Sequence, residues 1–170
     1  MIKTTTTIII FLSLINCYAQ ENKLKIQSFN FGLGGFSIKN NYSEGGGITF
    51  IADLNTSYKN SLIGFSFLTG AEIGIVGKSN YSFNELSILY GREFKLIKGF
   101  AFETFAGIGY YNQSSESYYI FNGDSASFPF KINSKFYLNK NFGLGLGTNY
   151  SINKINNNFS VNLICHYKFN

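Results

Sequence analysis

The chain has 170 residues, of which 45% are apolar, 18% are aromatic and only 14% are charged. This charged fraction is low beside the roughly 25% of ordinary soluble domains, and the apolar content excludes a disordered chain. Two cysteines and one proline exclude a disulfide scaffold and a collagen-like chain. The 18 glycines, 19 phenylalanines and 12 tyrosines favour strands over helices.

Residues 1–19 have the pattern of a secretory signal peptide. Lys3 supplies the positive charge, an apolar run follows, and Cys17 and Ala19 place small residues at the −3 and −1 positions of a cleavage site. We predict cleavage after Ala19, which makes residues 20–170 the mature domain. The alternative is a lipoprotein signal in which Cys17 is acylated, although Asn16 is bulky for the position before such a cysteine.

Removal of Cys17 with the signal would leave Cys165 as the only cysteine of the mature chain. An intramolecular disulfide is then impossible, even in a compartment that permits one. We interpret Cys165 as a small apolar side chain on a strand.

Apolar and polar residues alternate with period two from Leu24 onward, which is typical of half-buried strands. In the clearest segment, Phe65 and Phe67 lie on one face, and Ser66 and Glu72 lie on the other. The pattern predicts eight strands, at residues 24–38, 46–58, 62–76, 82–95, 99–112, 128–138, 141–152 and 158–169.

The two faces of these strands differ in size and charge. One face holds large apolar side chains, and the other holds Gly, Ser, Asn and isolated charges. A soluble barrel would turn the apolar face inward and cover the outer face with charged side chains. A glycine-rich polar face suits a narrow lumen better, with the apolar face turned to lipid as in a transmembrane barrel.

The connections between the predicted strands point to the same architecture. They are short after the second, fourth and sixth strands and longer on average after the others, with the longest at 113–127. Outer-membrane barrels alternate short periplasmic turns with longer extracellular loops in this way. We therefore predict an all-β, eight-stranded antiparallel up-and-down transmembrane barrel in the bacterial outer membrane. A soluble periplasmic lipocalin-like barrel, with a lipid inside an apolar cavity, is the alternative.

Aromatic residues gather near the predicted strand ends, where two interfacial girdles are expected. The periplasmic girdle would contain Tyr90, Phe94, Phe100, Phe136, Phe142, Tyr167 and Phe169. The outer girdle would contain Tyr81, Phe83, Tyr110, Phe128 and Tyr150.

The C-terminal strand ends in an alternating apolar pattern. It consists of Val161, Leu163, Cys165, Tyr167 and Phe169. This pattern resembles the insertion signal of outer-membrane barrels, except that one further residue follows Phe169. Segments 84–91 and 141–147 are also similar to strands of the small outer-membrane β-barrel family common in Bacteroidota, whose architecture is like that of OmpX and the OmpA transmembrane domain. The resemblance implies assembly by the outer-membrane insertion machinery, and it implies no activity.

The sequence offers few candidates for chemistry. Its single histidine, His166, lies near the predicted periplasmic rim without a neighbouring serine, and we interpret it as a solvated rim histidine rather than the base of a lipid A-modifying enzyme. Glu72 and Glu85 are symmetric about the loop at 78–79, so a regular hairpin would place them opposite each other. Two close carboxylates would need a cation or, as we favour, an interior base such as Lys131.

The remaining charges on the inward face predict a polar lumen. The interior polar residues would be Asp53, Glu103, Lys131 and Lys135, with an ion pair between Glu103 and Lys135. No metal-ligand cluster and no nucleotide-binding fingerprint is present, so no cofactor is expected. The lysines are scattered, so no nucleic-acid partner is expected either.

The basic residues near the predicted periplasmic turns are placed to meet lipid phosphates. They are Lys59, Arg92, Lys95, Lys98, Lys140 and Lys168. We expect a monomeric, non-enzymatic barrel with a lumen filled by side chains, whose partners are outer-membrane lipid and the insertion machinery. Function would then reside in loops for recognition, adhesion or envelope integrity, above all in the Ser-, Asn- and Tyr-rich segment 112–127, whose ligand the sequence leaves open.

Overall fold

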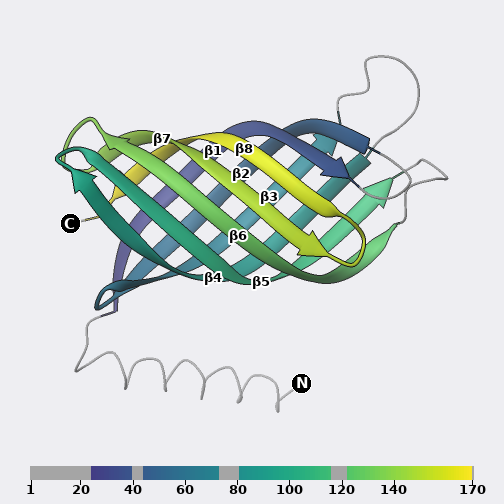
Figure 1. The fold of residues 1–170 in the computed structure, drawn as a ribbon, viewed down its shortest axis with the longest axis horizontal. Coiled ribbons are helices and arrows are strands. Elements are labelled where there is room, and N and C mark those ends of the chain that lie inside the picture. Colours follow the sequence, from purple (N-terminus) through teal and green to yellow (C-terminus); the bar gives the residue numbers. More distant parts are fainter. Residues whose placement is uncertain (1–23, 40–43, 73–80, 116–121, 170) are drawn as a thin grey trace, which may run out of the picture.

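The structure, a computed structural model, describes residues 24–39, 44–72, 81–115 and 122–169. Eight antiparallel strands form a closed barrel in which each strand pairs with its neighbours in the chain and the last strand pairs with the first (Figure 1). The strands are β1 (Lys25–Lys39), β2 (Glu44–Tyr58), β3 (Ser61–Glu72), β4 (Tyr81–Ile97), β5 (Phe100–Ser115), β6 (Gly123–Tyr137), β7 (Phe142–Asn153) and β8 (Asn157–Lys168). The predicted fold is confirmed, whereas the predicted signal peptide lies outside the described residues and stays a prediction.

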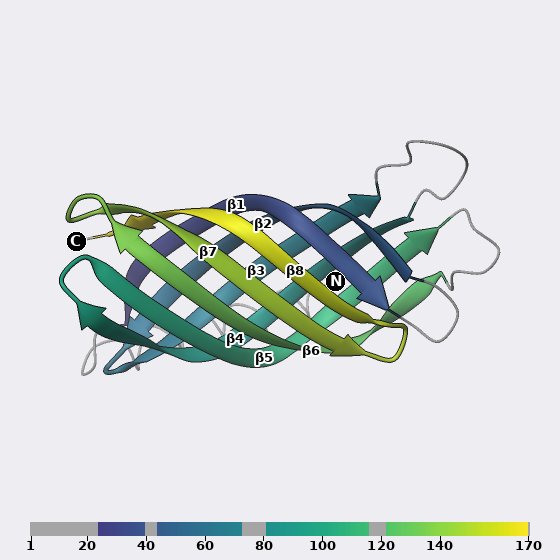
Figure 2. The same cartoon turned by 45° about the horizontal axis from the view of Figure 1, so that its top comes forward.

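The two ends of the barrel differ in their connections. The tight connections at 59–60, 98–99 and 138–141 lie at the end where β1 begins and β8 finishes, which we call the terminus end (Figures 1 and 2). The strands β1, β3, β5 and β7 finish at the opposite end, which we call the loop end. Within the described ranges, no helix is long and apolar enough to cross a membrane.

The large apolar side chains lie on the outside of the barrel. Phe65 and Leu144 are 51% and 44% exposed, whereas the inward-facing Asn149 is 4% exposed. The same inversion holds on β8, where Leu163 is 72% exposed and Asn162 is fully buried. A lipocalin-like barrel requires these apolar faces to line its cavity, so the structure excludes that alternative.

The strand boundaries correct one prediction. The expected fifteen-residue loop at 113–127 is largely strand, because β5 continues to Ser115 and β6 begins at Gly123. Serine and asparagine are common in turns, so their presence at the ends of β5 and β6 resembles a loop although both strands continue through them. Residues 116–121, which form most of the remaining connection, lie outside the described part of the chain.

Closure of the barrel depends on close approach of backbones at the seam between β1 and β8. Gly34 pairs with Asn162 across this seam. A Cβ atom at Gly34 would lie 1.9 Å from the carbonyl oxygen of Val161, so only glycine fits without moving a strand. This explains why glycines recur on the lumen face rather than on the outer face.

Candidate functional site

A buried salt bridge occupies the middle of the lumen. Lys131 Nζ lies 2.6 Å from Asp53 Oδ1, and the two side chains are 2% and 3% exposed. Ser66 Oγ accepts a hydrogen bond from Lys131 Nζ at 2.8 Å and donates one to Asp53 Oδ1 at 2.7 Å. Asn30 Nδ2 donates to Asp53 Oδ2 at 3.3 Å. The pair therefore has the additional hydrogen bonds that buried charges need.

A second ion pair lies closer to the terminus end. Lys135 Nζ is 2.6 Å from Glu103 Oε1, and both side chains are fully buried. Asn133 Nδ2 donates to Glu103 Oε2 at 3.3 Å. Beyond it, at the mouth of the barrel, Lys168 Nζ is 3.8 Å from Glu93 Oε1. Asp53, Glu103, Lys131 and Lys135, all expected inside the barrel, thus lie in the lumen as two separate pairs.

His166 differs from its expected environment. It points into the lumen and is 1% exposed, so the prediction of a solvated rim histidine is wrong. Its Nδ1 lies 2.5 Å from Asn30 Oδ1 and its Nε2 lies 3.0 Å from Tyr137 OH. The alternating pattern gave its direction correctly, but its burial depends on Tyr137, which packs edge-on against the imidazole.

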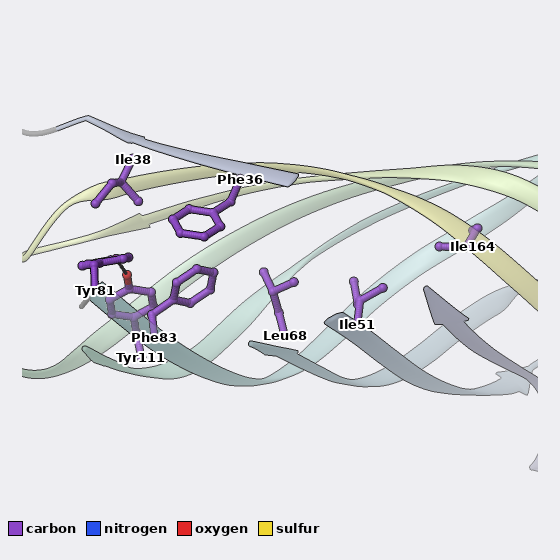
Figure 3. Close-up of a cluster of buried hydrophobic side chains, with 8 residues drawn as sticks. All are labelled: Phe36, Ile38, Ile51, Leu68, Tyr81, Phe83, Tyr111 and Ile164. Atoms are coloured by element: carbon purple, nitrogen blue, oxygen red, sulfur yellow. Dashed lines mark hydrogen bonds between the residues drawn. The ribbon is translucent and has the colours of Figure 1, made fainter. Parts of the chain in front are cut away.

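The loop-end half of the lumen is closed by an apolar and aromatic plug (Figure 3). Phe83 is fully buried, stacks on Tyr111 and packs edge-on against Phe36. The buried apolar cluster consists of Phe36, Ile38, Ile51, Leu68, Tyr81, Phe83, Tyr111 and Ile164. Its rings form the plug, whereas Ile164 lies farthest from them, toward the terminus end (Figure 3). Tyr81 and Phe83 were predicted to form part of the outer girdle, and that placement is wrong because both side chains point into the lumen.

Hydroxyl and amide groups hold the outermost part of the plug together. The hydroxyls of Tyr81 and Tyr111 are 2.6 Å apart, and both lie within hydrogen-bond distance of Gln113 Oε1, at 3.0 and 3.2 Å. Asn156, from the connection between β7 and β8, is 5% exposed and donates through Nδ2 to Tyr81 OH at 3.2 Å. The tyrosines are therefore buried with partners for their polar ends, as buried tyrosines require.

Glu85 lies beneath this plug without a charged partner. Its Oε1 accepts hydrogen bonds from Ser127 Oγ at 2.9 Å and Ser151 Oγ at 3.0 Å, and its Oε2 has no hydrogen-bond partner. Among the described residues, no basic group forms an ion pair with it. Lys131, the base proposed to neutralise it, forms its ion pair with Asp53 instead.

The proposed Glu72 and Glu85 pair does not form. Glu85 pairs with Leu68 in the β3–β4 register, and Ala71 pairs with Ser82. The two glutamates are therefore offset by four residues, because the hairpin is not symmetric about positions 78–79. The described residues contain no group of three metal-ligating side chains, and Glu72 and Glu85 do not combine into a site.

The residues of the C-terminal signal pattern lie on the outer face of β8. Cys165 is half-buried, whereas Val161, Leu163, Tyr167 and Phe169 are exposed. The inner face of the same strand carries buried Ser160, Asn162 and His166. This strand closes the barrel against β1, so its outer face joins the apolar belt that surrounds the molecule.

The two predicted girdles are only partly formed. On the terminus-end half of the belt, the predicted rings that are exposed are Tyr90, Phe94, Phe136, Tyr167 and Phe169, whereas Phe100 and Phe142 are half-buried. On the loop-end half, Tyr110, Phe128 and Tyr150 are exposed. Without Tyr81 and Phe83, the loop-end half has fewer outward-facing rings than the sequence indicated.

No model of a known protein family matches the sequence. No curated protein matches it as a relative. The fold, however, is shared with solved outer-membrane proteins. Neisserial surface protein A has a TM-score of 0.71 at 8% identity, over 84% of this chain and 97% of that one. Ail, the attachment invasion locus protein of Yersinia pestis, has a TM-score of 0.61 at 15% identity, over 85% and 99%.

The N-terminal barrel domain of Pseudomonas aeruginosa OprF is a third similar structure, with a TM-score of 0.58 at 11% identity, over 86% of this chain and 100% of that domain. At these identities the likeness shows the fold alone. The chain has the fold of small eight-stranded outer-membrane barrels. An origin in Bacteroidota and a closer relation to OmpX remain predictions.

The plug is the main feature of the lumen that the sequence analysis missed. The sequence contains a signal for it, because Tyr81 and Phe83 are separated from Glu85 by an even number of positions, and Tyr111 is two positions from Gln113. Residues two apart in a strand face the same way, so these rings had to point inward. The nearness of Tyr81 and Phe83 to a strand end indicates a girdle instead.

Proposed function

We propose that this chain is an integral, non-enzymatic protein of the bacterial outer membrane, with its belt in lipid and its lumen closed. The observation that carries the proposal is the inverted sidedness of the barrel. Exposed Leu, Ile and Phe surround a core that contains Asp53, Lys131, Glu103 and Lys135. Soluble monomers rarely expose contiguous apolar patches above a few hundred Å², whereas a transmembrane barrel turns an apolar band of this kind toward lipid.

The closed lumen makes the barrel an anchor rather than a channel. The plug blocks the loop-end half, and the Lys131–Asp53 pair crosses the lumen from β6 to β2 on the opposite side of the wall. The Lys135–Glu103 pair joins the neighbouring strands β6 and β5 and fills the lumen nearer the terminus end. An eight-stranded barrel leaves only enough interior for side chains. Solute flow is therefore not its function.

The surroundings of His166, as far as the described residues show them, support a non-enzymatic role. His166 hydrogen bonds to Asn30 and Tyr137. A catalytic histidine would instead contact a serine or cysteine nucleophile on one side and an orienting carboxylate on the other. Any recognition or adhesion then takes place at the loop end, where β5 and β6 carry polar groups such as Asp124 beyond the plug. This assignment of recognition to the loop end is part of the proposal.

Assembly by the outer-membrane insertion machinery follows from the same proposal. The outer face of β8 presents Tyr167 and Phe169, whose rings pack edge-on with centroids 5.2 Å apart. Replacement of both by alanine should slow the appearance of folded barrel in cells, whereas the same change at the exposed residues Tyr58 and Tyr90 should not.

Gel mobility after refolding in detergent tests the membrane assignment. A closed barrel stays folded in dodecyl sulfate at room temperature, so the unboiled band should migrate differently from the boiled one. The mature chain should also resist extraction from membranes by alkaline carbonate and give no steady conductance in a planar bilayer. Solubility of the folded chain in plain buffer, without a mobility shift, would refute the assignment.

A further inference from the structure

Basic residues are concentrated at the terminus end of the barrel. Those that the structure describes there are Lys25, Lys59, Arg92, Lys95, Lys98, Lys140 and Lys168, and Glu93 is the acidic residue among them. At the loop end, by contrast, Lys154 is accompanied by Glu72 and Asp124. The terminus end therefore has a positive potential that the rest of the described surface does not share.

Part of this charge surrounds a groove of about 710 Å³ between the β4–β5 turn and the β6–β7 turn. Its basic residues are Lys95, Lys98, Lys140 and Lys168, and none of the described residues that line it is acidic. Of these four basic residues, Lys168 forms an ion pair, in which its Nζ lies 3.8 Å from Glu93 Oε1. At least three ammonium groups in the groove thus lack a protein counter-ion among the described residues.

The same groove is lined by large exposed apolar side chains. Ile97 is 71% exposed and Leu138 is 66% exposed, and both line the groove with Phe100. They continue the apolar belt through Leu96 and Phe136, which are 64% and 59% exposed. A site for a small soluble anion would have no use for these apolar walls.

The walls of the groove are held in place by backbone hydrogen bonds. Tyr137 N donates to Gly99 O at 2.8 Å, which ties the start of the β6–β7 turn to the β4–β5 turn (the two neighbouring turns are visible in Figures 1 and 2). Lys168 N, at the end of β8, donates a hydrogen bond to Asn141 O at 2.6 Å and so fixes the other side of the β6–β7 turn. Lys168 Nζ also lies 5.8 Å from the centre of the Tyr137 ring. The groove is therefore preorganised rather than formed by free loops.

We propose that this groove binds one anionic phospholipid of the leaflet at the terminus end, with the lysines on its phosphate and Ile97 and Leu138 against its glycerol and upper acyl chain. The inference rests on the membrane assignment above. A zwitterionic lipid carries its own cation and would leave the lysine charges uncompensated, so the site selects a net negative headgroup. A lysine ammonium attracts an anionic headgroup as a point charge, and it does not need the planar two-point geometry through which arginine binds a phosphate. Each lysine near the anionic surface therefore adds to the binding of the headgroup.

The experiment measures lipid retention by native mass spectrometry of the folded barrel in micelles that contain equal amounts of phosphatidylglycerol and phosphatidylcholine. The wild-type chain should retain one phosphatidylglycerol in preference to phosphatidylcholine. The Lys95→Gln, Lys98→Gln, Lys140→Gln triple variant should bind phosphatidylglycerol about tenfold more weakly or worse. The gel mobility shift of each sample shows that it is folded.

A second triple variant, Lys25→Gln, Lys59→Gln, Arg92→Gln, is the matched control. It removes the same charge from the same end of the barrel but changes no residue that lines the groove. Lys25, Lys59 and Arg92 line a neighbouring hollow, which shares Lys95 and Lys168 with the groove. Phosphatidylglycerol binding should remain within about twofold of wild type, because only diffuse attraction is lost. Equal losses in the two triple variants would overturn the proposal, since they would indicate diffuse attraction without a site.

Two further measurements show whether the ligand is a lipid or a free phosphate. The mobility shift shows whether a negative result comes from the groove or from the barrel as a whole. Soluble glycerol phosphate should compete poorly, and Leu138→Ser should weaken retention of the lipid. Competition by glycerol phosphate as strong as by the lipid would overturn the lipid assignment. A missing mobility shift in the wild-type chain would refute the membrane barrel, whereas a folded barrel without headgroup preference would refute the groove alone.

Discussion

The two halves of the lumen solve the same packing problem in different ways. From its middle to the terminus end, the lumen pairs its charges, with Lys131 on Asp53 and Lys135 on Glu103. The half toward the loop end excludes charge with stacked rings around Phe83, except for Glu85, which is held by two serines. The difference indicates that stability depends on charge balance in one half and on shape and hydroxyl bonding in the other.

The largest effect is expected from breaking the central ion pair. Asp53→Ala leaves the Lys131 ammonium buried without a partner, which should cost about 3 to 5 kcal/mol of unfolding free energy. Urea titration in detergent micelles, followed by gel mobility, measures it. The double change Asp53→Ala, Lys131→Met removes both charges and should recover most of the loss. A double variant as unstable as the single one would show that the pair's charge balance is not what matters.

The next largest effect is expected at the seam that closes the barrel. Gly34→Ala forces a methyl group against the carbonyl oxygen of Val161, and we expect a loss of about 3 kcal/mol, at the upper end for overpacking. Gly35→Ala is the control, because its Cβ would meet only Gly47 O, at 3.5 Å. The same urea titration should find Gly35→Ala close to wild type. Equal tolerance of both substitutions would contradict the close approach at this seam.

A smaller effect is expected in the plug. Tyr111→Phe keeps the ring but removes the hydroxyl that is shared with Tyr81 and Gln113, and this should cost about 1 to 2 kcal/mol. Tyr110→Phe changes the adjacent tyrosine, whose ring is 53% exposed on the outer face, and should have little effect. If the two variants unfold at the same urea concentration, the hydroxyl cluster does not stabilise the plug.

The smallest effect is expected at Glu85. Glu85→Gln keeps an oxygen that accepts from Ser127 and Ser151 and removes a charge that has no buried partner, so the unfolding free energy should change by less than about 1 kcal/mol. The difference between the unfolding free energies lost in Glu85→Gln and in Asp53→Ala is the largest contrast expected between the two halves of the lumen. A loss at Glu85 as large as that at Asp53 would mean that Glu85 has a counter-charge that the described residues do not supply.

The sequence predicted the barrel because its main signal is local. Alternation on β3 and β8 determines which side chains share a face, and the size of Phe65 and Leu163 against their glycine and asparagine neighbours determines which face is outside. A one-residue slip would reverse every side chain of a strand, so the sidedness is specified many times over. This redundancy explains why the number of strands and their sidedness follow from the sequence without a relative, whereas the loop-end bounds of β5 and β6 do not.

Features that depend on register were predicted less well. The offset of Glu72 from Glu85 depends on how the hairpin pairs across residues 73–80, and composition says nothing about it. The burial of His166 depends on Tyr137 and Asn30, which come from distant strands. The plug is hard to predict because Tyr81 lies near a strand end, where aromatic residues are also expected on the outer face, and only its place in the alternation shows that it points inward.

The most direct test of the central claim is the exposure of matched rings to lipid. The chain has no tryptophan, so Phe65→Trp and Phe105→Trp each introduce a single fluorescent reporter, one on the outer face and one in the lumen, where Phe105 is 5% exposed. In vesicles of brominated phospholipid, the fluorescence of the Phe65→Trp variant should be strongly quenched and that of Phe105→Trp should persist. Stronger quenching at position 105 than at position 65 would contradict the account.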